Sequence, residues 1–408
     1  MTQNRSEGSR DNITDEAPDK SASMTSNARP PTVLQVLPEL VTGGVERGTV
    51  DIAGAIVDGG GRAIVASAGG PMAHELARFG AEHVMLPVQS KNPFVIQKNI
   101  NRLADLAVAE NVDIIHARSR ASAWSAMYAA KKTGKNFITT FHGTYGHANS
   151  VKRAYNSVMT KGVRVIAISN FIAGHIRQVY GVPAANIRVI PRGVDLSRFN
   201  SEFVSRERII SLARKWRLPD GVPVIMLPGR LTRWKGQSIF IEAIKELGRK
   251  DVQCLIMGSD QGRHSYRREL ERFIESHGMT RNVHVIGHCD DMPAAYMLTD
   301  VVISASTDPE AFGRVIAEAQ ALGRPVIATD HGGAKETVIP GETGWLVPPG
   351  DADALAQAIE KVLKLDSAQR STLAGKAIAN VRDNFSKANM CTKTLDVYDE
   401  VLGIRPAG

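Results

Sequence analysis

The chain has 408 residues, of which 43% are hydrophobic and 23% charged, so it resembles soluble globular proteins in composition and is long enough for two domains. The net charge of +8 permits anionic partners, but aromatics make up only 5% and no basic block is interleaved with them, which argues against nucleic acid. No apolar run is long enough to span a membrane. The cysteines, Cys254, Cys289 and Cys391, form no CxxC pair, which indicates a reducing, cytoplasmic location without disulfides or zinc.

Residues 1–30 are polar and lack an apolar centre, so we expect a disordered tail rather than a signal peptide. From Thr32 onward, short β-branched runs alternate with amphipathic segments. Six runs lie in each half: 32–38, 62–67, 112–117, 137–143, 163–169 and 187–191, then 223–229, 252–258, 283–288, 300–306, 324–330 and 344–349. This alternation predicts an α/β protein with two doubly wound, Rossmann-like domains. Their ligands lie at the carboxyl ends of the strands, facing a central cleft.

The boundary between the halves is a polar stretch rich in turn residues, and we place the linker between about Leu196 and Gly221. The N-terminal domain then covers residues 31–200, and the C-terminal domain covers residues 201–384. Residues 385–408 have the pattern of a last amphipathic helix, which we expect to cross back to the N-terminal domain.

Several polar or glycine residues follow the strands predicted in the first half. Gly43 and Gly44 form a turn before a helix, which lets backbone N–H groups approach a phosphate or serves only as a tight turn. His142 follows a strand and either binds a ligand or is bonded to nearby backbone. Arg118 and Arg120 flank Ser119 at the carboxyl end of a strand, where arginines grip phosphate or carboxylate, unless they lie in a solvated loop.

The second half offers a basic pair and two acidic pairs. Arg230 and Lys235 follow a strand that ends at Gly229, and two cations there suit a diphosphate, although a basic surface loop is the alternative. The loop at residues 287–291 can read a nucleobase edge, but Asp291 itself is better explained as a helix cap. Asp351, in an Asp-Ala-Asp sequence, is also predicted to cap a helix rather than to bind metal.

Two glutamates, Glu310 and Glu318, lie eight residues apart, the first in a loop and the second in a helix predicted to start at Phe312 or Gly313. Eight helical residues rise about 12 Å, which exceeds the carboxylate separation of a glycoside hydrolase. The free N–H groups of Phe312, Gly313 and Arg314 would bind an anion at the helix start. We therefore interpret the two acids as clamps on one ligand rather than as an acid and a base.

Five stretches in this order resemble glycosyltransferase family 4, which has the GT-B fold: residues 43–46, 140–143, 229–236, 308–338 and 341–351. The resemblance extends from about Thr32 to Leu402 and is most specific in the Arg-x4-Lys and Glu-x7-Glu spacings. It implies a retaining transferase that takes a hexose from a nucleotide-diphosphate sugar. It also implies that no metal or other cofactor is needed, because cations and a helix N-terminus stabilise the leaving group.

The resemblance also implies a role for each matching residue. Glu310 would contact the donor sugar's hydroxyls, Glu318 would bond the ribose, and His142 would lie near the reacting carbon. The diphosphate would be neutralised by Arg230 and Lys235, and Gly44 would let its loop close on the phosphates.

Two positions depart from the family pattern. Ala311 stands where proline is common, and Arg192 stands where asparagine is common, which puts the role of residue 192 in doubt.

Three further stretches are similar to bacterial transferases of lipopolysaccharide core or other envelope glycans: residues 43–53, 116–124 and 287–296. This would suit Arg118 and Arg120 as ligands of an anionic acceptor, and a peripheral contact with the cytoplasmic face of the inner membrane. Residues 150–164 supply four cations for such a surface, or form a solvated helix. Two alternatives stay open: a nucleotide-sugar epimerase or phosphorylase on the same fold, and a non-catalytic sugar-binding protein.

Overall fold

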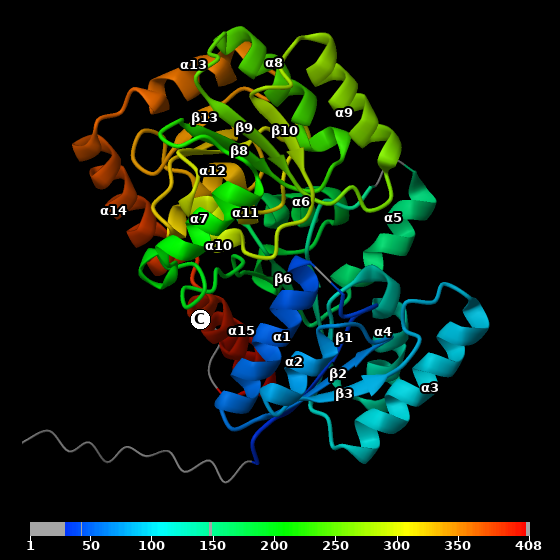
Figure 1. Cartoon of the computed structure of the whole chain (residues 1–408). Coiled ribbons are helices and arrows are strands. Elements are labelled where there is room, and N and C mark those ends of the chain that lie inside the picture. The colour runs from blue at the N-terminus through cyan, green and yellow to red at the C-terminus, as the bar shows by residue number, and fades with distance from the viewer. Residues whose placement is uncertain (1–28, 42, 147–148, 405–408) are drawn as a thin grey trace, which may run out of the picture. The chain divides into compact units, whose positions relative to one another are not determined.

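The computed structural model describes residues 29–41, 43–146 and 149–404, and Pro31 onward belongs to one compact unit (Figure 1). The predicted disordered tail therefore lies almost entirely outside the described residues. Within the described ranges, every helix is too short or too polar to cross a lipid bilayer. The three cysteines are free thiols.

The first sheet contains seven parallel strands in the order β3-β2-β1-β4-β5-β6-β7. Their bounds are β1 Thr32–Val36, β2 Arg62–Ser67, β3 Glu82–Met85, β4 Ile114–Ala117, β5 Asn136–Phe141, β6 Arg164–Ala167 and β7 Ile187–Val189. The sequence pattern predicted six of these strands and missed β3. This edge strand has no fully buried residue, so it lacks the continuous apolar run of the interior strands.

The second sheet contains six parallel strands in the order β10-β9-β8-β11-β12-β13, and all six were predicted. Their bounds are β8 Val224–Pro228, β9 Gln253–Met257, β10 Val283–Ile286, β11 Val301–Ser304, β12 Val326–Thr329 and β13 Trp345–Val347. The interior strands are buried along their whole length because helices cover both faces of the sheet. The predicted fold class, two doubly wound Rossmann-like sheets, is confirmed.

Helices alternate with the strands throughout (Figure 1). Their bounds are α1 Gly44–Asp58, α2 Ala73–Arg78, α3 Pro93–Ala109, α4 Arg120–Thr133, α5 Ser150–Asn156, α6 Asn170–Tyr180, α7 Arg206–Lys215, α8 Gln237–Leu247, α9 His264–Ser276, α10 Met292–Met297, α11 Arg314–Ala321, α12 Ala334–Thr337, α13 Ala352–Leu363, α14 Ser367–Asn384 and α15 Lys387–Leu402. The predicted linker region contains α7, which packs against α10 beside the second sheet. A polar composition therefore concealed a helix there.

Both sheets reverse their strand order at one place. In the first sheet this place lies between β1 and β4, and in the second it lies between β8 and β11. Loops that leave two such neighbouring strands turn to opposite faces and open a crevice at the carboxyl ends, where ligands of doubly wound sheets bind. The predicted site residues follow these four strands and β5, so the topology gathers them at two crevices.

The chain passes between the two sheets twice, and the two passages are bonded together. Val194 donates its N–H to the Phe385 carbonyl and accepts from the Lys387 N–H, each at 2.8 Å. The α15 helix then packs on α1, as Figure 1 shows, and its Tyr398 hydroxyl lies 2.7 Å from Nδ1 of buried His116. The C-terminal helix thus contacts the first sheet's layer.

Candidate active site

A buried ion pair occupies the crevice of the second sheet. Lys235 Nζ lies 2.7 Å from Glu310 Oε1, and the two side chains are only 12% and 13% exposed. Lys235 belongs to the loop after β8, and Glu310 belongs to the loop after β11. The two strands are neighbours at the place where the strand order reverses, so residues 75 apart in sequence meet there.

Two serine hydroxyls complete the surroundings of this carboxylate. Ser306 and Ser304 donate to Glu310 Oε1 at 2.6 and 3.2 Å. Burial acts to raise the pKa of Glu310, but the charge and hydrogen bond of Lys235 outweigh it and hold the pKa below its usual 4.5. Glu310 is therefore ionised at neutral pH. All three bonds end on Oε1, which leaves Oε2 without a donor in the part of the chain that the structure describes.

A second glycine pair, absent from the predicted site, holds the Glu310 loop in place. The Gly333 N–H donates to the Glu310 carbonyl at 2.7 Å, and His331 Nε2 lies 2.8 Å from the Ser306 carbonyl. A Cβ at Gly332 would overlap the Glu310 backbone, and its φ of +61° also favours glycine. The loop thus needs glycine for close backbone approach.

Glu318 has partners of its own. Arg314 Nη2 donates to its Oε1 at 2.6 Å, and the Tyr296 hydroxyl donates to its Oε2 at 3.1 Å. Glu318 lies in the second turn of α11, as predicted, and its side chain is only 9% exposed. The two glutamates therefore lie in separate polar clusters and share no partner.

The helix that contains Glu318 begins just after the two predicted starts, Phe312 and Gly313. α11 starts at Arg314, after Gly313 with a left-handed φ of +90°. The N–H groups of Phe312, Gly313 and Arg314 donate to no acceptor among the described residues. The Phe312 ring is buried against Phe385, with centroids 5.5 Å apart, so only its backbone can face a ligand.

The glycine turn of the first sheet faces this helix start. Gly43 precedes α1 and Gly44 is its first residue. A Cβ added at Gly44 would lie 2.8 Å from Arg192 Nη1 and 3.3 Å from Arg314 Cδ. A side chain there would displace the end of the Arg192 side chain, so glycine at this position lets that arginine lie against the turn.

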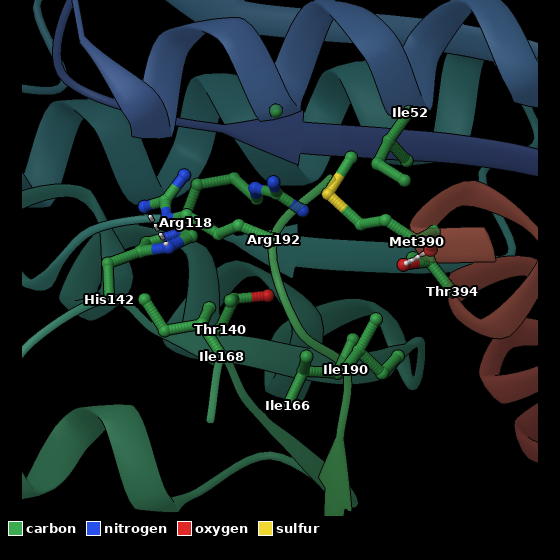
Figure 2. Close-up of a pocket in the computed structure, with 11 residues that line it drawn as sticks. Ile52, Arg118, Thr140, His142, Ile166, Ile168, Ile190, Arg192, Met390 and Thr394 are labelled. Atoms are coloured by element: carbon green, nitrogen blue, oxygen red, sulfur yellow. Dashed lines mark hydrogen bonds between the residues drawn. The ribbon is translucent and has the colours of Figure 1, made fainter. Parts of the chain in front are cut away.

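His142, Arg118 and Arg192 gather beside that turn and line a small cavity (Figure 2). The free volume is about 20 Å³, room for about one water molecule. Arg192 Nη2 lies 2.9 Å from His142 Nδ1, and Arg192 Nη1 donates to the Gly44 carbonyl. The other lining residues are Gly48, Ile52, Thr140, Ile166, Ile168, Ile190, Met390 and Thr394.

The charges in this cluster have few partners. Arg118 is only 4% exposed, and neither a carboxylate nor a hydrogen-bond acceptor pairs with it among the described residues. Burial lowers the pKa of Arg118, and it lowers the pKa of Arg192 to about 9 with help from Arg314 and Arg118. Both stay cationic at neutral pH. Buried charges are normally paired, so the charge of Arg118 is left uncompensated by the described residues.

Two predicted site residues lie differently. Arg120 donates to Asn156 Oδ1 at 3.1 Å and stacks over the Tyr145 ring at 4.2 Å, so its guanidinium is already engaged. Arg230 follows β8 with an exposed side chain, and no acceptor bonds it in the described part of the chain. The structure therefore brings Arg118 to the His142 cluster and leaves Arg120 outside it.

Both predicted helix caps are confirmed. Asp291 accepts from the Ala294 N–H at 3.2 Å, and Asp351 accepts from the Ala354 N–H at 2.8 Å. The described residues contain no group of three or more metal-ligating side chains. One expectation was wrong: Arg164, counted among four surface cations, pairs with Glu400 at 2.6 Å, so it faces α15.

Sequence reasoning missed three members of the site. Arg192 had been noticed only as a departure from the family pattern, and its contacts with Gly44 and His142 are visible only in the structure. Tyr296 and Ser306 gave no signal, because a tyrosine in a helix and a serine in a loop are common. Each reaches the site through tertiary packing.

Two family models match successive parts of the chain. Residues 42–198 match "Glycosyltransferase Family 4", and residues 209–379 match "Glycosyl transferases group 1". A solved glycosyltransferase from Rickettsia africae is 39% identical, with 92% of this chain and 99% of that chain covered and a TM-score of 0.86. The chain is a family 4 glycosyltransferase. The predicted transferase class and GT-B fold are thereby confirmed.

This family 4 glycosyltransferase is also similar to two proteins whose substrate or bound ligand is named. A D-inositol 3-phosphate glycosyltransferase from Xylanimonas cellulosilytica is 28% identical, with 72% of this chain and 73% of that protein covered. HepE from Anabaena, solved in complex with UDP-glucose, is 25% identical, with 90% of this chain and 99% of that chain covered and a TM-score of 0.79.

Proposed function

We propose that this family 4 glycosyltransferase is a retaining enzyme that moves a hexose from a nucleotide-diphosphate sugar to an anionic glycan or glycolipid. The observation that carries the proposal is the buried Lys235–Glu310 pair, placed beside the unbonded N–H groups that open α11. Such a site offers both a cation for a leaving diphosphate and a carboxylate for sugar hydroxyls. The likeness to a protein solved with UDP-glucose supports a donor of this class.

The donor's diphosphate gains charge as the glycosidic bond breaks. Lys235 and Arg230 would stabilise that charge, together with the N–H groups at the start of α11. The Lys235 ammonium has three N–H donors and uses one for the hydrogen bond to Glu310, so it keeps donors for the phosphates. With these groups in place, transfer requires no metal ion, and we expect a chelator to leave the rate unchanged.

The sugar and ribose would be held by the remaining polar groups. Glu310 Oε2, which has no partner in the described residues, is suited to accept from a hydroxyl of the hexose. Glu318 retains lone pairs for the ribose hydroxyls, since each carboxylate oxygen has one donor. Gly43 and Gly44 would let the α1 start approach the phosphates, and His142 would lie by the hexose.

An anionic acceptor follows from Arg118, a buried cation without a carboxylate partner in the described residues. The likeness to a D-inositol 3-phosphate glycosyltransferase supports an acceptor of this class. Arg120 is less suited to bind the acceptor, because its guanidinium already donates to Asn156 and stacks on Tyr145. An acidic precursor of lipopolysaccharide core or another envelope polysaccharide would be an anionic acceptor of this kind. The enzyme would meet such a precursor in the cytoplasm or at the cytoplasmic face of the inner membrane.

The proposal is tested with Glu310→Gln and Lys235→Met, assayed for nucleoside diphosphate release and for glycoside product with anionic acceptors. Loss of one such group typically reduces turnover by about 100-fold or more. Lys245→Met and Glu246→Gln, at exposed positions of α8, are matched controls that should retain wild-type rates. The anomeric configuration of the product, read by NMR against that of the donor, tests retention.

Other outcomes would identify the alternatives. Full activity in both site variants would overturn the assigned roles. Epimerised sugar formed from donor without acceptor, or sugar phosphate formed with inorganic phosphate, would favour an epimerase or a phosphorylase. Saturable donor binding without any turnover would favour a sugar-binding protein.

A further inference from the structure

Arg192 links two parts of the site that are distant in sequence. It follows β7 and extends towards the end of β5 and the start of α1. One end of its guanidinium donates to the Gly44 carbonyl, and the other lies 2.9 Å from His142 Nδ1. A single side chain thus fixes both the glycine turn and the imidazole.

The contact with His142 determines where the imidazole carries its proton. A guanidinium is only a donor, so His142 Nδ1 must be the acceptor, and the proton of the neutral ring must lie on Nε2. The ring is neutral because burial, with the charges of Arg192 and Arg118 and a smaller effect of His116, holds the pKa of His142 well below 6.5. The Tyr145 hydroxyl accepts from the backbone N–H of His142 at 3.4 Å, so this contact does not involve the ring.

The other ring nitrogen points at no protein group. His142 Nε2 is buried and has no hydrogen-bond partner among the described residues, and the ring lines the cavity of about 20 Å³ (Figure 2). That volume has room for about one water molecule or one oxygen atom of a ligand, and it is too small for a sugar ring. The group that satisfies Nε2–H is therefore a single oxygen, brought to the cavity by a larger molecule in the crevice or by one water.

We infer that Arg192 is a positioning residue, which holds His142 as an Nε2–H hydrogen-bond donor aimed at one oxygen of the bound substrate while it ties down the Gly44 turn. The inference rests on the proposed function for the identity of that oxygen, a hydroxyl or phosphoryl oxygen of donor or acceptor. It gives His142 the role of a donor and removes it as a general base. It also assigns a purpose to the arginine that replaces the family's usual asparagine.

The tautomer can be read directly by ¹⁵N NMR of histidine-labelled protein without any sugar, with His142→Gln to assign the signal. We expect the wild type to show Nε2–H over the neutral range. Arg192→Met should introduce the Nδ1–H form and raise the pKa of His142 towards its usual value, because a positive neighbour is removed. Arg192→Lys, which still donates, should restore the Nε2–H form. A wild-type Nδ1–H signal would overturn the inference, whether or not Arg192→Met folds.

Kinetics separate positioning from simple packing. Arg192→Met should lower kcat by about tenfold, the worth of one hydrogen bond, while Arg192→Lys recovers most of it. The exposed Arg102→Met of α3 is the matched control and should retain wild-type kcat. Equal loss in the Met and Lys variants, with an unchanged NMR signature, would overturn the positioning role. The Nε2–H signature without transfer to any acceptor would support the inference and count against the proposed function alone.

Discussion

At the scale of single residues, the site depends on charges that are buried but not equally paired. Glu310 has three donors on one oxygen, whereas Arg118 has no carboxylate partner in the described residues. A paired buried charge contributes little net stability, but removing one partner leaves the other uncompensated. The Lys235–Glu310 pair therefore allows a prediction of a stability change whose size depends on pH.

We predict that Lys235→Met destabilises the protein most at neutral pH. In the wild type, the depressed pKa of Glu310 means that its ionised form stabilises the fold above its usual pKa of 4.5, and this contribution is lost on acidification. In the variant, Lys235 no longer opposes the effect of burial, which raises the pKa of Glu310, so the charged form costs stability as pH rises. The deficit, about 3 kcal/mol at pH 7, should narrow towards about pH 4.

Urea unfolding of the wild type and the variant at several pH values measures this deficit. Lys245→Met, exposed on α8, should show a small deficit that does not change with pH. Lys235→Met combined with Glu310→Gln should recover part of the loss, since no buried charge is left unpaired. A deficit of Lys235→Met that is constant across pH would contradict the prediction.

At the scale of elements, a carboxylate beside one sheet caps a helix beside the other. Glu336 of α12 accepts from the N–H groups of Asn170 and Phe171, at 2.8 and 2.7 Å, at the start of α6. The Ser169 hydroxyl, in the same turn, donates to the Ala311 carbonyl at 2.6 Å. Ala311 follows Glu310, so the cap of α6 and the Glu310 loop are physically connected.

We predict that Glu336→Ala costs about 1 kcal/mol of unfolding free energy, the usual worth of a cap. It should also accelerate hydrogen exchange at the amides of Asn170 and Phe171, because two donors lose their acceptor. Urea titration and exchange mass spectrometry measure the two effects. Glu246→Ala, on an exposed face of α8, is the control. Unchanged exchange at the start of α6 would show that the capping bonds are dispensable.

At the scale of the whole molecule, the proposed donor site draws on both sheets. Gly44 belongs to the first sheet's layer and lies beside Arg314 of the second. The α15 helix starts at the second crossing of the chain and packs on α1, whose first residue is Gly44. A donor bound here would contact both sheets' layers, so its binding energy would add to the stability of the folded chain.

We predict that one class of nucleotide-diphosphate sugar, among those of uridine, guanosine and adenosine, raises Tm most. Binding at a hundredfold excess over Kd stabilises the folded state by about 2.7 kcal/mol. Thermal scans with each sugar nucleotide and its parent nucleoside diphosphate would separate base from sugar. In Glu310→Gln, the gain from the sugar should shrink while the gain from the nucleotide persists. The absence of any shift at saturating concentrations would contradict a donor site.

Local patterns determined most of the fold and only part of the site. Apolar runs identified twelve of the thirteen strands of the two sheets, because buried parallel strands need such runs; β3, half-exposed at an edge, had none. Asp291 and Asp351 were recognisable as caps, because a cap acts on N–H groups three residues away. Arg164 was misjudged, because its partner Glu400 lies 236 residues further along the chain.

By itself, the sequence determined the alternation of strands and helices, the strand ends that carry Lys235, Glu310 and His142, and the family resemblance. Each is a local property, set by side-chain periodicity and turn chemistry. The tertiary structure alone decided which of these groups meet. Lys235 pairs with Glu310 because β8 and β11 are neighbours, and Arg192 reaches both Gly44 and His142 because three distant segments converge. Such contacts depend on strand order and side-chain reach, which no stretch of neighbouring residues encodes.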